Sequence, residues 1–390
     1  MKRRSVLCSG ASLIAAGATI LNSLPSIAAT LSDKSVRFMR AYEVGELGRK
    51  NYGLRIVRRP VPDVAAGQVL LRMHATGLNA RDLALLRGLR IYGGVHDPTR
   101  IPLDDNACEV LALGAGVTDF KIGDRVLCTH FPLWLGGPWD DVTMSGVDFG
   151  VNTNGFLAEQ VAVPAQGLVR IPREISYQAA ATFPNAGLTA WHAVMVAANL
   201  QAGETMVTLG TGGVSVFGMQ WAKLRGAKVA ITSSQDTKLV RMRELGAEIT
   251  INYRNNPDWH HELLELTQGR GADVVLNTVG IAELERCLLA CNSNGRVMVI
   301  GANSVTRGKG TATTAEFTGL KVFPRAMIMR GLTIRGIIVG SRQMLADALQ
   351  AAASAGLLPV IDRVFSFEHA REAITYMESG EKIGKIIISI

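Results

Sequence analysis

The sequence predicts an α/β protein in which a doubly wound parallel-sheet domain is joined to a second, β-rich domain. Two observations carry this prediction. A strand, glycine turn, helix and second strand follow one another over residues 204–238, and short strand signals with frequent turns fill residues 36–171. The length of 390 residues is enough for two domains with a large core. A hydrophobic content of 48% excludes a disordered chain.

The dinucleotide site is predicted from the stretch at residues 204–238. Thr205 to Leu209 is an apolar, β-branched run typical of a buried parallel strand, and Lys228 to Thr232 supplies the next strand. Between them, apolar residues recur at helical spacing from Val214 to Arg225. A turn that leads into a helix offers free N–H groups and a favourable helix dipole to a pyrophosphate. We therefore expect the cofactor to contact the turn residues Gly210, Gly212, Gly213 and Val214, although Ser215 replaces the third glycine of the usual motif.

The residues after the second strand favour NADP(H) over NAD(H). NAD-binding folds carry an acid there for the ribose 2′-hydroxyl, about twenty residues past the first glycine. This chain instead has Ser233 and Ser234, with Lys238 one helical turn further on. Hydroxyl groups and a cation suit a 2′-phosphate. Alternatively, either serine caps the helix that begins near Asp236, and both roles are compatible.

The first 29 residues are predicted to be a signal peptide. Lys2, Arg3 and Arg4 precede an interrupted apolar stretch that ends in small residues, and this arrangement resembles a twin-arginine export signal. We expect a periplasmic protein without a membrane anchor once the signal is removed; the alternative is an uncleaved extension on a cytoplasmic enzyme. These three residues supply part of the net charge of +8, and no basic run remains to indicate nucleic-acid binding.

Several linked motifs occur in order from about Val36 to the C-terminus: GLNARDL, EVLALGAGV with FKIGDRV, NAGLTAWHAV, the glycine turn, SSQDTK, ELGAEITINYR and GKIII. Together they resemble the zinc-independent, quinone oxidoreductase-like branch of the medium-chain dehydrogenase/reductase superfamily. The resemblance implies a GroES-like catalytic domain over residues 36–170, completed by residues 355–390, and a Rossmann domain over residues 171–354. It also implies a small-molecule substrate, and we expect a homodimer.

The same resemblance bears on metal binding. Zinc-bearing relatives have a cysteine at the position of Asn79, a histidine near Asp104 and a cysteine at the position of Asn185. Two amides and a carboxylate make a poor site for Zn²⁺, which prefers thiolate and imidazole ligands. The four-cysteine lobe that holds a structural zinc is also missing. We therefore expect no metal.

Further cofactor contacts follow from the resemblance and from strand ends. The resemblance places Thr189 near the nicotinamide ring and Tyr253 beside the adenosine phosphate; Tyr253 alternatively covers the sheet edge. His192, in the same segment as Thr189, is expected to be structural rather than catalytic. Asn277 and Gly301 end two buried strands, at the edge where open α/β sheets bind ligands.

The function that follows is hydride transfer from NADPH to a quinone, enone or other small carbonyl compound, without metal. Hydrogen-bond donors must then stabilise the developing negative charge, and Asn79 and then Arg81 are the candidates. The proton is expected to come from solvent. Two alternatives stay open: an alcohol or aldehyde dehydrogenase reaction, which normally relies on zinc, and a non-catalytic NADP-binding protein.

Overall fold

The computed structural model describes residues 36–46, 53–88, 96–140, 147–301 and 323–390. The predicted signal peptide, residues 1–29, lies outside these ranges. Residues Arg37–Ile390 form one unit, which contains two large sheets. No helix within the described ranges is long and apolar enough to cross a membrane.

The first large sheet is parallel throughout and confirms the predicted fold class. Its strand order is β10-β9-β8-β11-β12-β13. The chain therefore starts at the middle strand, builds outward to one edge, and then returns to build the other half. Ligands of such sheets bind beyond the carboxyl ends of the strands, where the two halves meet. The strands are β8 (Thr205–Leu209), β9 (Lys228–Ser233), β10 (Ile249–Asn252), β11 (Ala272–Asn277), β12 (Cys291–Val299) and β13 (Thr333–Gly336).

The β8–α5–β9 unit agrees with the sequence prediction to within one residue at each boundary. Helix α5 spans Gly213–Leu224 and packs closely on the sheet, since a Cβ atom on Gly218 would lie 2.4 Å from a methyl carbon of Leu276. Ser215 fits at the position of the missing third glycine because its buried hydroxyl donates to the Leu209 carbonyl at 2.8 Å.

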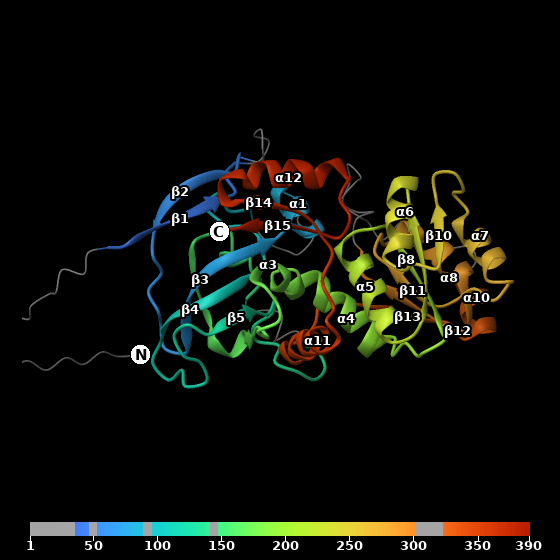
Figure 1. Ribbon diagram of the computed structural model, residues 1–390, viewed down its shortest axis with the longest axis horizontal. Helices are drawn as coiled ribbons and strands as arrows, with labels where there is room; N and C mark the ends of the chain where they lie inside the picture. The colour runs from blue at the N-terminus through green and yellow to red at the C-terminus, as the bar shows by residue number, and fades with distance from the viewer. Residues whose placement is uncertain (1–35, 47–52, 89–95, 141–146, 302–322) are drawn as a thin grey trace, which may run out of the picture. The chain divides into compact units, whose positions relative to one another are not determined.

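Helices cover the parallel sheet on both sides, as Figure 1 shows. The segment that carries the NAGLTAWHAV motif is helical but irregular: π-helical turns at Phe183–Gly187 and His192–Ala197 flank α4 (Leu188–Trp191). Ser341 caps α11 by accepting from the Met344 N–H at 3.2 Å. The remaining helices of this part of the chain are α6 (Asp236–Glu244), α7 (Trp259–Leu266), α8 (Leu284–Ala290), α10 (Phe323–Arg330) and α11 (Arg342–Ala355).

The second large sheet is built from both ends of the described chain. Its order is β14-β15-β3-β4-β5-β7, with β6 paired to β3. Strand β15 (Lys385–Ser389) lies antiparallel beside β3 (Gln68–Gly77), the red and blue neighbours in Figure 1. The other strands are β4 (Ala107–Leu113), β5 (Arg125–Cys128), β6 (Gln160–Pro164), β7 (Leu168–Arg170) and β14 (Ile361–Ser366).

Two further strands and three helices complete this part of the molecule. Strands β1 (Phe38–Glu43) and β2 (Arg55–Pro60) form an antiparallel pair of their own, and α1 (Ala80–Leu86) and α3 (Tyr177–Ala180) are short helices. Helix α12 (Ala370–Ser379) lies in the C-terminal tail between β14 and β15, and its apolar residues Ala370, Ala373, Ile374 and Met377 recur at helical spacing and are buried.

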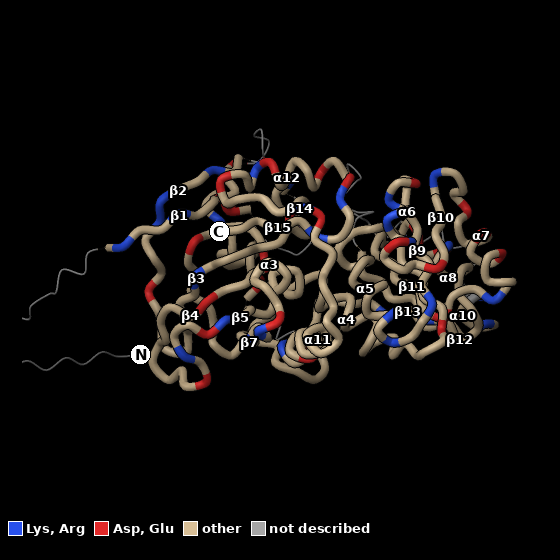
Figure 2. Tube along the Cα trace, in the orientation of Figure 1, with Lys and Arg blue, Asp and Glu red and all other residues tan. Residues whose placement is uncertain are grey.

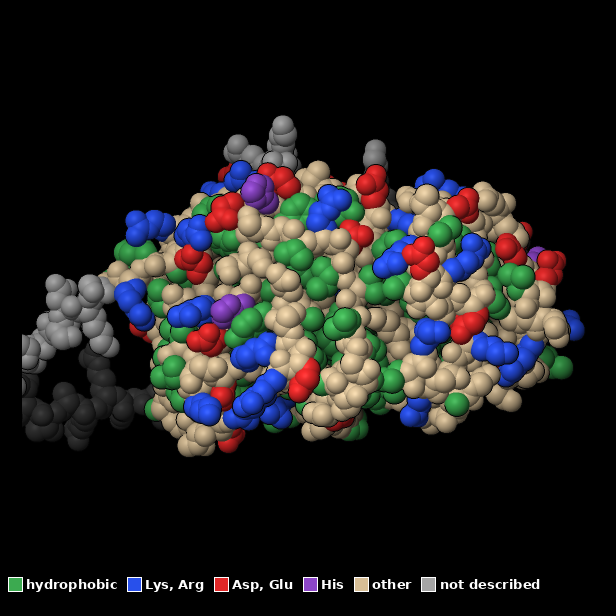
Figure 3. Space-filling view, in the orientation of Figure 1, with side chains coloured by type: hydrophobic (Ala, Val, Ile, Leu, Met, Phe, Trp, Pro, Cys, Tyr) green, Lys and Arg blue, Asp and Glu red, His purple; other side chains and the backbone are tan. Residues whose placement is uncertain are grey.

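Basic and acidic side chains are interspersed over the face of the molecule in Figure 3. The same mixture is visible along the chain in Figure 2.

Candidate active site

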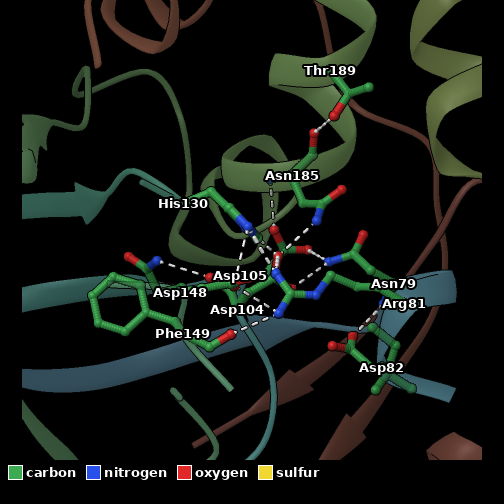
Figure 4. Close-up of polar contacts among 12 residues, drawn as sticks. Asn79, Arg81, Asp82, Asp104, Asp105, His130, Asp148, Phe149, Asn185 and Thr189 are labelled. Carbon is green, nitrogen blue, oxygen red and sulfur yellow. Dashed lines mark hydrogen bonds and ion pairs between the residues drawn. The ribbon is translucent and has the colours of Figure 1, made fainter. Parts of the chain in front are cut away.

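The three residues at the positions of zinc ligands in the resembled family meet in a buried cluster (Figure 4). Asn79 precedes α1, Asp104 lies before β4, and Asn185 lies in the π-helical turn before α4. The side-chain amide of Asn79 donates to Asp104 at 3.0 Å, and that of Asn185 donates to Asp104 at 2.6 Å. Asp104 is thus the centre of the cluster, with the two amides as its donors.

Asp105 and Lys385 form the second half of this cluster. Their side chains are 0% and 2% exposed, and the ammonium nitrogen lies 2.6 Å from the Asp105 carboxylate. The same ammonium group donates to the Asn79 side-chain oxygen and the Leu78 carbonyl, each at 2.7 Å. Asn79 also donates to Asp105 at 2.9 Å. All three polar hydrogens of Lys385 and both amide hydrogens of Asn79 are therefore used within the protein.

Arg81 connects the cluster to a loop after β5. Its guanidinium group donates to Asp104 at 3.2 Å, and to Asp148 and the Phe149 carbonyl at 2.9 Å each. His130 lies between the two carboxylates, with its Nδ1 atom 2.7 Å from Asp104 and its Nε2 atom 3.4 Å from Asp148. The Arg81 Nη1 atom is 2.8 Å from the Nε2 atom of this ring.

The two adjacent aspartates have pKa values shifted in opposite directions. Burial and the neighbouring Asp104 charge outweigh the attraction of Lys385 and raise the pKa of Asp105 to about 6. For Asp104, burial is outweighed by the Arg81 charge and by hydrogen bonds from His130 and Asn185, which hold its pKa well below the ordinary value. Burial and Arg81 disfavour the charged form of His130, but Asp104 and Asp148 prevail and raise its pKa.

This donor set does not fit Zn²⁺. The amide groups of Asn79 and Asn185 present N–H donors to Asp104, not lone pairs, and the cationic groups of Arg81 and Lys385 already neutralise the carboxylates. Within the described ranges, no three His, Cys, Asp or Glu side chains are placed to hold a metal ion. The positive charges that balance these carboxylates come from Arg81 and Lys385.

Thr189 and His192 lie on the segment that leads away from this cluster. The Thr189 hydroxyl donates to the Asn185 carbonyl at 2.7 Å, which ties it to the helical turn before it. The Nδ1 atom of His192 lies 3.1 Å from the carbonyls of Ile338 and Val339. Its pKa is lowered by burial, which these carbonyls only partly offset. The structural role expected for His192 agrees with these backbone contacts.

The glycine turn has room for a phosphate group. Gly210 has φ +78°, a conformation that favours glycine, and its added Cβ atom would meet nothing within 4 Å. At Gly212 the nearest atom to an added Cβ is the Lys382 ammonium nitrogen, at 3.8 Å. Gly213 starts α5, with Val214 next. The open face of the turn and the start of a 12-residue helix fit the pyrophosphate of a dinucleotide.

The residues predicted to bind the adenosine end of the cofactor lie at or after the ends of the neighbouring strands β9 and β10. Tyr253 donates its backbone N–H to the Ser233 carbonyl at 3.1 Å, and its side chain is 40% exposed. Lys238 lies in α6, and its ammonium group donates to the Gly380 carbonyl. Neither serine is the N-cap of α6: that residue is Gln235, and the Ser233 hydroxyl accepts from its N–H at 3.3 Å. The Ser234 side chain is half-buried.

Asn277 and Gly301 lie at the carboxyl ends of two neighbouring strands, as predicted from their sequence positions. The fully buried Asn277 side chain donates to the Gly280 carbonyl at 2.9 Å and accepts from the Gly280 N–H at 2.8 Å. The Asn277 side chain therefore stabilises the loop at residues 277–280, which follows β11. A Cβ atom on Gly301 would lie 2.2 Å from the Thr278 carbonyl oxygen, so only glycine fits this close approach.

Sequence reasoning missed four members of the cluster: Asp105, His130, Asp148 and Lys385. Asp105 is adjacent to Asp104 in the sequence, but no role was assigned to it. Its carboxylate fits because a Cβ atom on Gly77 would lie 2.6 Å from it, so that glycine leaves the space. The signal for Lys385 was the closing GKIII motif, whose lysine had no assigned role.

Comparisons with known proteins agree with this architecture. Residues 65–173 match the family described as alcohol dehydrogenase GroES-like domain, and residues 213–354 match the family described as zinc-binding dehydrogenase. A zinc-type alcohol dehydrogenase-like protein of Schizosaccharomyces pombe is 34% identical over 83% of this chain and 91% of its own length.

Solved structures agree as well. The crystal structure of a putative alcohol dehydrogenase from Sinorhizobium meliloti is 34% identical, with a TM-score of 0.80 over 90% of this chain and 99% of that one. A structure named NAD-dependent alcohol dehydrogenase is 28% identical, with a TM-score of 0.77 over 90% of this chain and 100% of that one. The chain therefore belongs to the medium-chain dehydrogenase/reductase superfamily and is an alcohol dehydrogenase-like oxidoreductase that uses a nicotinamide cofactor.

Proposed function

We propose that the protein is an NADPH-dependent reductase that transfers hydride to a quinone, enone or other small carbonyl compound without a metal ion. The observation that carries this proposal is the buried cluster, in which Arg81 and Lys385 neutralise Asp104 and Asp105. A dehydrogenase that oxidises alcohols through zinc needs an open metal position. The amides and internal cations of this chain supply none.

The bound nicotinamide supplies the hydride, and the protein orients the acceptor and stabilises the charge that develops on it. Both amide hydrogens of Asn79 are donated to Asp104 and Asp105, and Arg81 contacts Asp104, Asp148 and the Phe149 carbonyl. Asn185 is the more exposed of the two cluster amides, with one hydrogen directed to Asp104. We propose that Asn185 donates its second hydrogen to the substrate oxygen, with Asn79 and Arg81 holding the cluster in place and Thr189 fixing the Asn185 turn.

The test is NADPH oxidation with a panel of enones, quinones and aldehydes, before and after dialysis against a chelator, together with zinc analysis. We expect turnover with an enone or quinone, unchanged activity after chelation, and far less than stoichiometric zinc. Aldehyde reduction that is lost on chelation from a stoichiometric zinc protein would establish the alcohol dehydrogenase alternative. Tight NADPH binding with no turnover would establish a non-catalytic protein.

The choice of NADPH over NADH rests on Lys238. Among the described residues, no carboxylate forms an ion pair with its ammonium group, and Ser233 and Tyr253 lie at the end of the neighbouring strands. Lys238→Ala should weaken NADPH binding by about ten- to a hundredfold, the usual worth of a charged hydrogen bond, and change NADH binding little. Titration of each cofactor with tryptophan fluorescence as the readout measures both. The matched control is Lys228→Ala, which removes an exposed lysine from the other end of β9. Equal losses for the two cofactors would contradict the assignment.

We also propose that the protein acts in the periplasm as a homodimer, after twin-arginine export. The location rests on the sequence of residues 1–29, and the homodimer on the resemblance to the dehydrogenase family.

A further inference from the structure

A short segment after α12, residues 380–384, contacts the nucleotide-binding turn. The Gly384 N–H donates to the Thr211 carbonyl at 2.9 Å, and Gly384 pairs with Gly212 in an isolated parallel bridge. At its other end, the Gly380 carbonyl accepts from Lys238 in α6. Residues 380–384 therefore contact both parts of the predicted cofactor site: the glycine turn, which is predicted to bind the pyrophosphate, and Lys238, which is predicted to bind the 2′-phosphate. Figure 2 shows the basic positions of α6 and of the chain after α12.

Lys382, in the middle of this segment, extends toward the glycine turn. Its ammonium nitrogen lies 3.8 Å from the position that a Cβ atom would take on Gly212, and no other atom lies so close to that position. Its one hydrogen bond is a long one, 3.4 Å, to the Gly384 carbonyl. Among the described residues, no carboxylate forms an ion pair with it. The carboxylate of Asp362 on β14 is already engaged by the Tyr376 hydroxyl at 2.8 Å and the Ile383 N–H at 3.0 Å.

The surroundings of Lys382 disfavour its positive charge, so a bound anion would stabilise it. Burial, together with the charges of Lys385 and Lys238, lowers the pKa of Lys382 to about 8 against a weaker opposing effect of Asp362. Burial also lowers the pKa of Lys238. Lys385 forms an ion pair with Asp105, whereas Lys382 and Lys238 form none among the described residues and are influenced only by the more distant carboxylates of Asp362 and, for Lys238, Glu381. An ammonium group without an ion-pair partner among the described residues, close to the N-terminus of α5, favours the binding of negative charge there.

We propose that Lys382 binds the pyrophosphate of the dinucleotide, across the glycine turn from the helix N-terminus, while Lys238 serves the 2′-phosphate. The assignment of Lys382 depends only on a dinucleotide binding at the turn. It does not depend on whether the cofactor is NADP or NAD, nor on which substrate is reduced. The chain after the parallel-sheet domain would then supply a cofactor ligand that the domain itself lacks.

Two fragments of the cofactor separate the roles of the two lysines. ADP-ribose carries the pyrophosphate without a 2′-phosphate, and adenosine 2′-monophosphate carries the 2′-phosphate without a pyrophosphate. By isothermal titration calorimetry at pH 7, Lys382→Gln should weaken ADP-ribose binding by about ten- to a hundredfold and leave adenosine 2′-monophosphate binding nearly unchanged. Lys238→Gln should show the reverse pattern. Lys382→Arg should retain ADP-ribose binding, and the exposed control Lys121→Ala should change neither.

A second readout uses pH. A bound pyrophosphate stabilises the ammonium form of Lys382, so binding of ADP-ribose to the wild type should take up protons near pH 8 and weaken as the pH rises further. Binding to Lys382→Gln should lose this dependence. The proposal is overturned if ADP-ribose binds folded Lys382→Gln as tightly as wild type, if both fragments lose affinity equally, or if wild type binds no ADP-ribose. Thermal melting of each variant verifies that it is folded.

Discussion

Lys385→Met should lower the free energy of unfolding at pH 7 by about 3–5 kcal/mol, because it leaves the Asp105 carboxylate buried without its counter-charge. The pair is 2.6 Å apart, and both side chains are almost completely buried. Methionine fills most of the space of the lysine stem, so little of the loss should come from a cavity. Urea denaturation followed by tryptophan fluorescence measures the change.

The pH dependence of this loss identifies Asp105 as its source. The folded-state pKa of Asp105, about 6, lies above its unfolded value of about 3.9. Protonated Asp105 therefore favours the folded state, and that contribution is lost as the pH rises through 6. Without Lys385 the folded pKa rises further, so the deficit of the variant should be smallest near pH 5 and grow toward pH 8. Adding Asp105→Asn should restore part of the stability. A deficit that is independent of pH, or no recovery in the double variant, would show that the ion pair is not the cause.

Arg81→Met should have an effect of similar size, about 3–5 kcal/mol at pH 7, through the other half of the cluster. Arg81 is 8% exposed and contacts two carboxylates, Asp104 and Asp148. Asp104 has a folded-state pKa below its unfolded value, so its charged form stabilises the protein above about pH 4, and this contribution is lost as the pH falls. Removal of Arg81 diminishes that contribution. The difference between variant and wild type should therefore be largest at neutral pH and shrink in acid, which denaturation curves at several pH values will measure.

Arg81→Lys is the matched control for charge. Lysine retains the positive charge but has no planar fork to contact Asp104 and Asp148 together, so it should recover only part of the lost stability. Full recovery would mean that charge alone matters. Wild-type stability of Arg81→Met across the pH range would mean that the cluster does not depend on the guanidinium group.

Prediction from the sequence succeeded where the signal was local. The β8–α5–β9 unit was located almost to the residue because a buried strand, a glycine turn and an amphipathic helix each have a short-range pattern. The π-helical turns at residues 183–187 and 192–197 and helix α12 were not predicted. In α12 the helical period is masked by the strand-like sequences on either side.

The candidate site was predicted only in part, for a physical reason. The family resemblance identified three residues at the positions of zinc ligands, Asn79, Asp104 and Asn185. The structure places both amides in hydrogen-bond contact with Asp104. Their charge balance could not be read from the sequence, because His130 and Asp148 come from loops without a pattern, and Lys385 is 280 residues from Asp105. Which cation neutralises which carboxylate is decided by the pairing of β15 with β3.

The position of Lys385 in the chain has a consequence for the order of folding. The carboxylate of Asp105 and the side chain of Asn79 are made early in synthesis, but the ammonium group that both contact arrives 280 and 306 residues later. Until then the early β-rich segment must either keep these groups in water or bury an uncompensated charge, and the second course is costly. The parallel sheet between them needs no partner from outside its own continuous stretch. The β-rich domain, although synthesised first, therefore cannot complete its buried cluster until residue 385 is made. The parallel-sheet domain is synthesised later but can form its sheet earlier, while the chain is still on the ribosome.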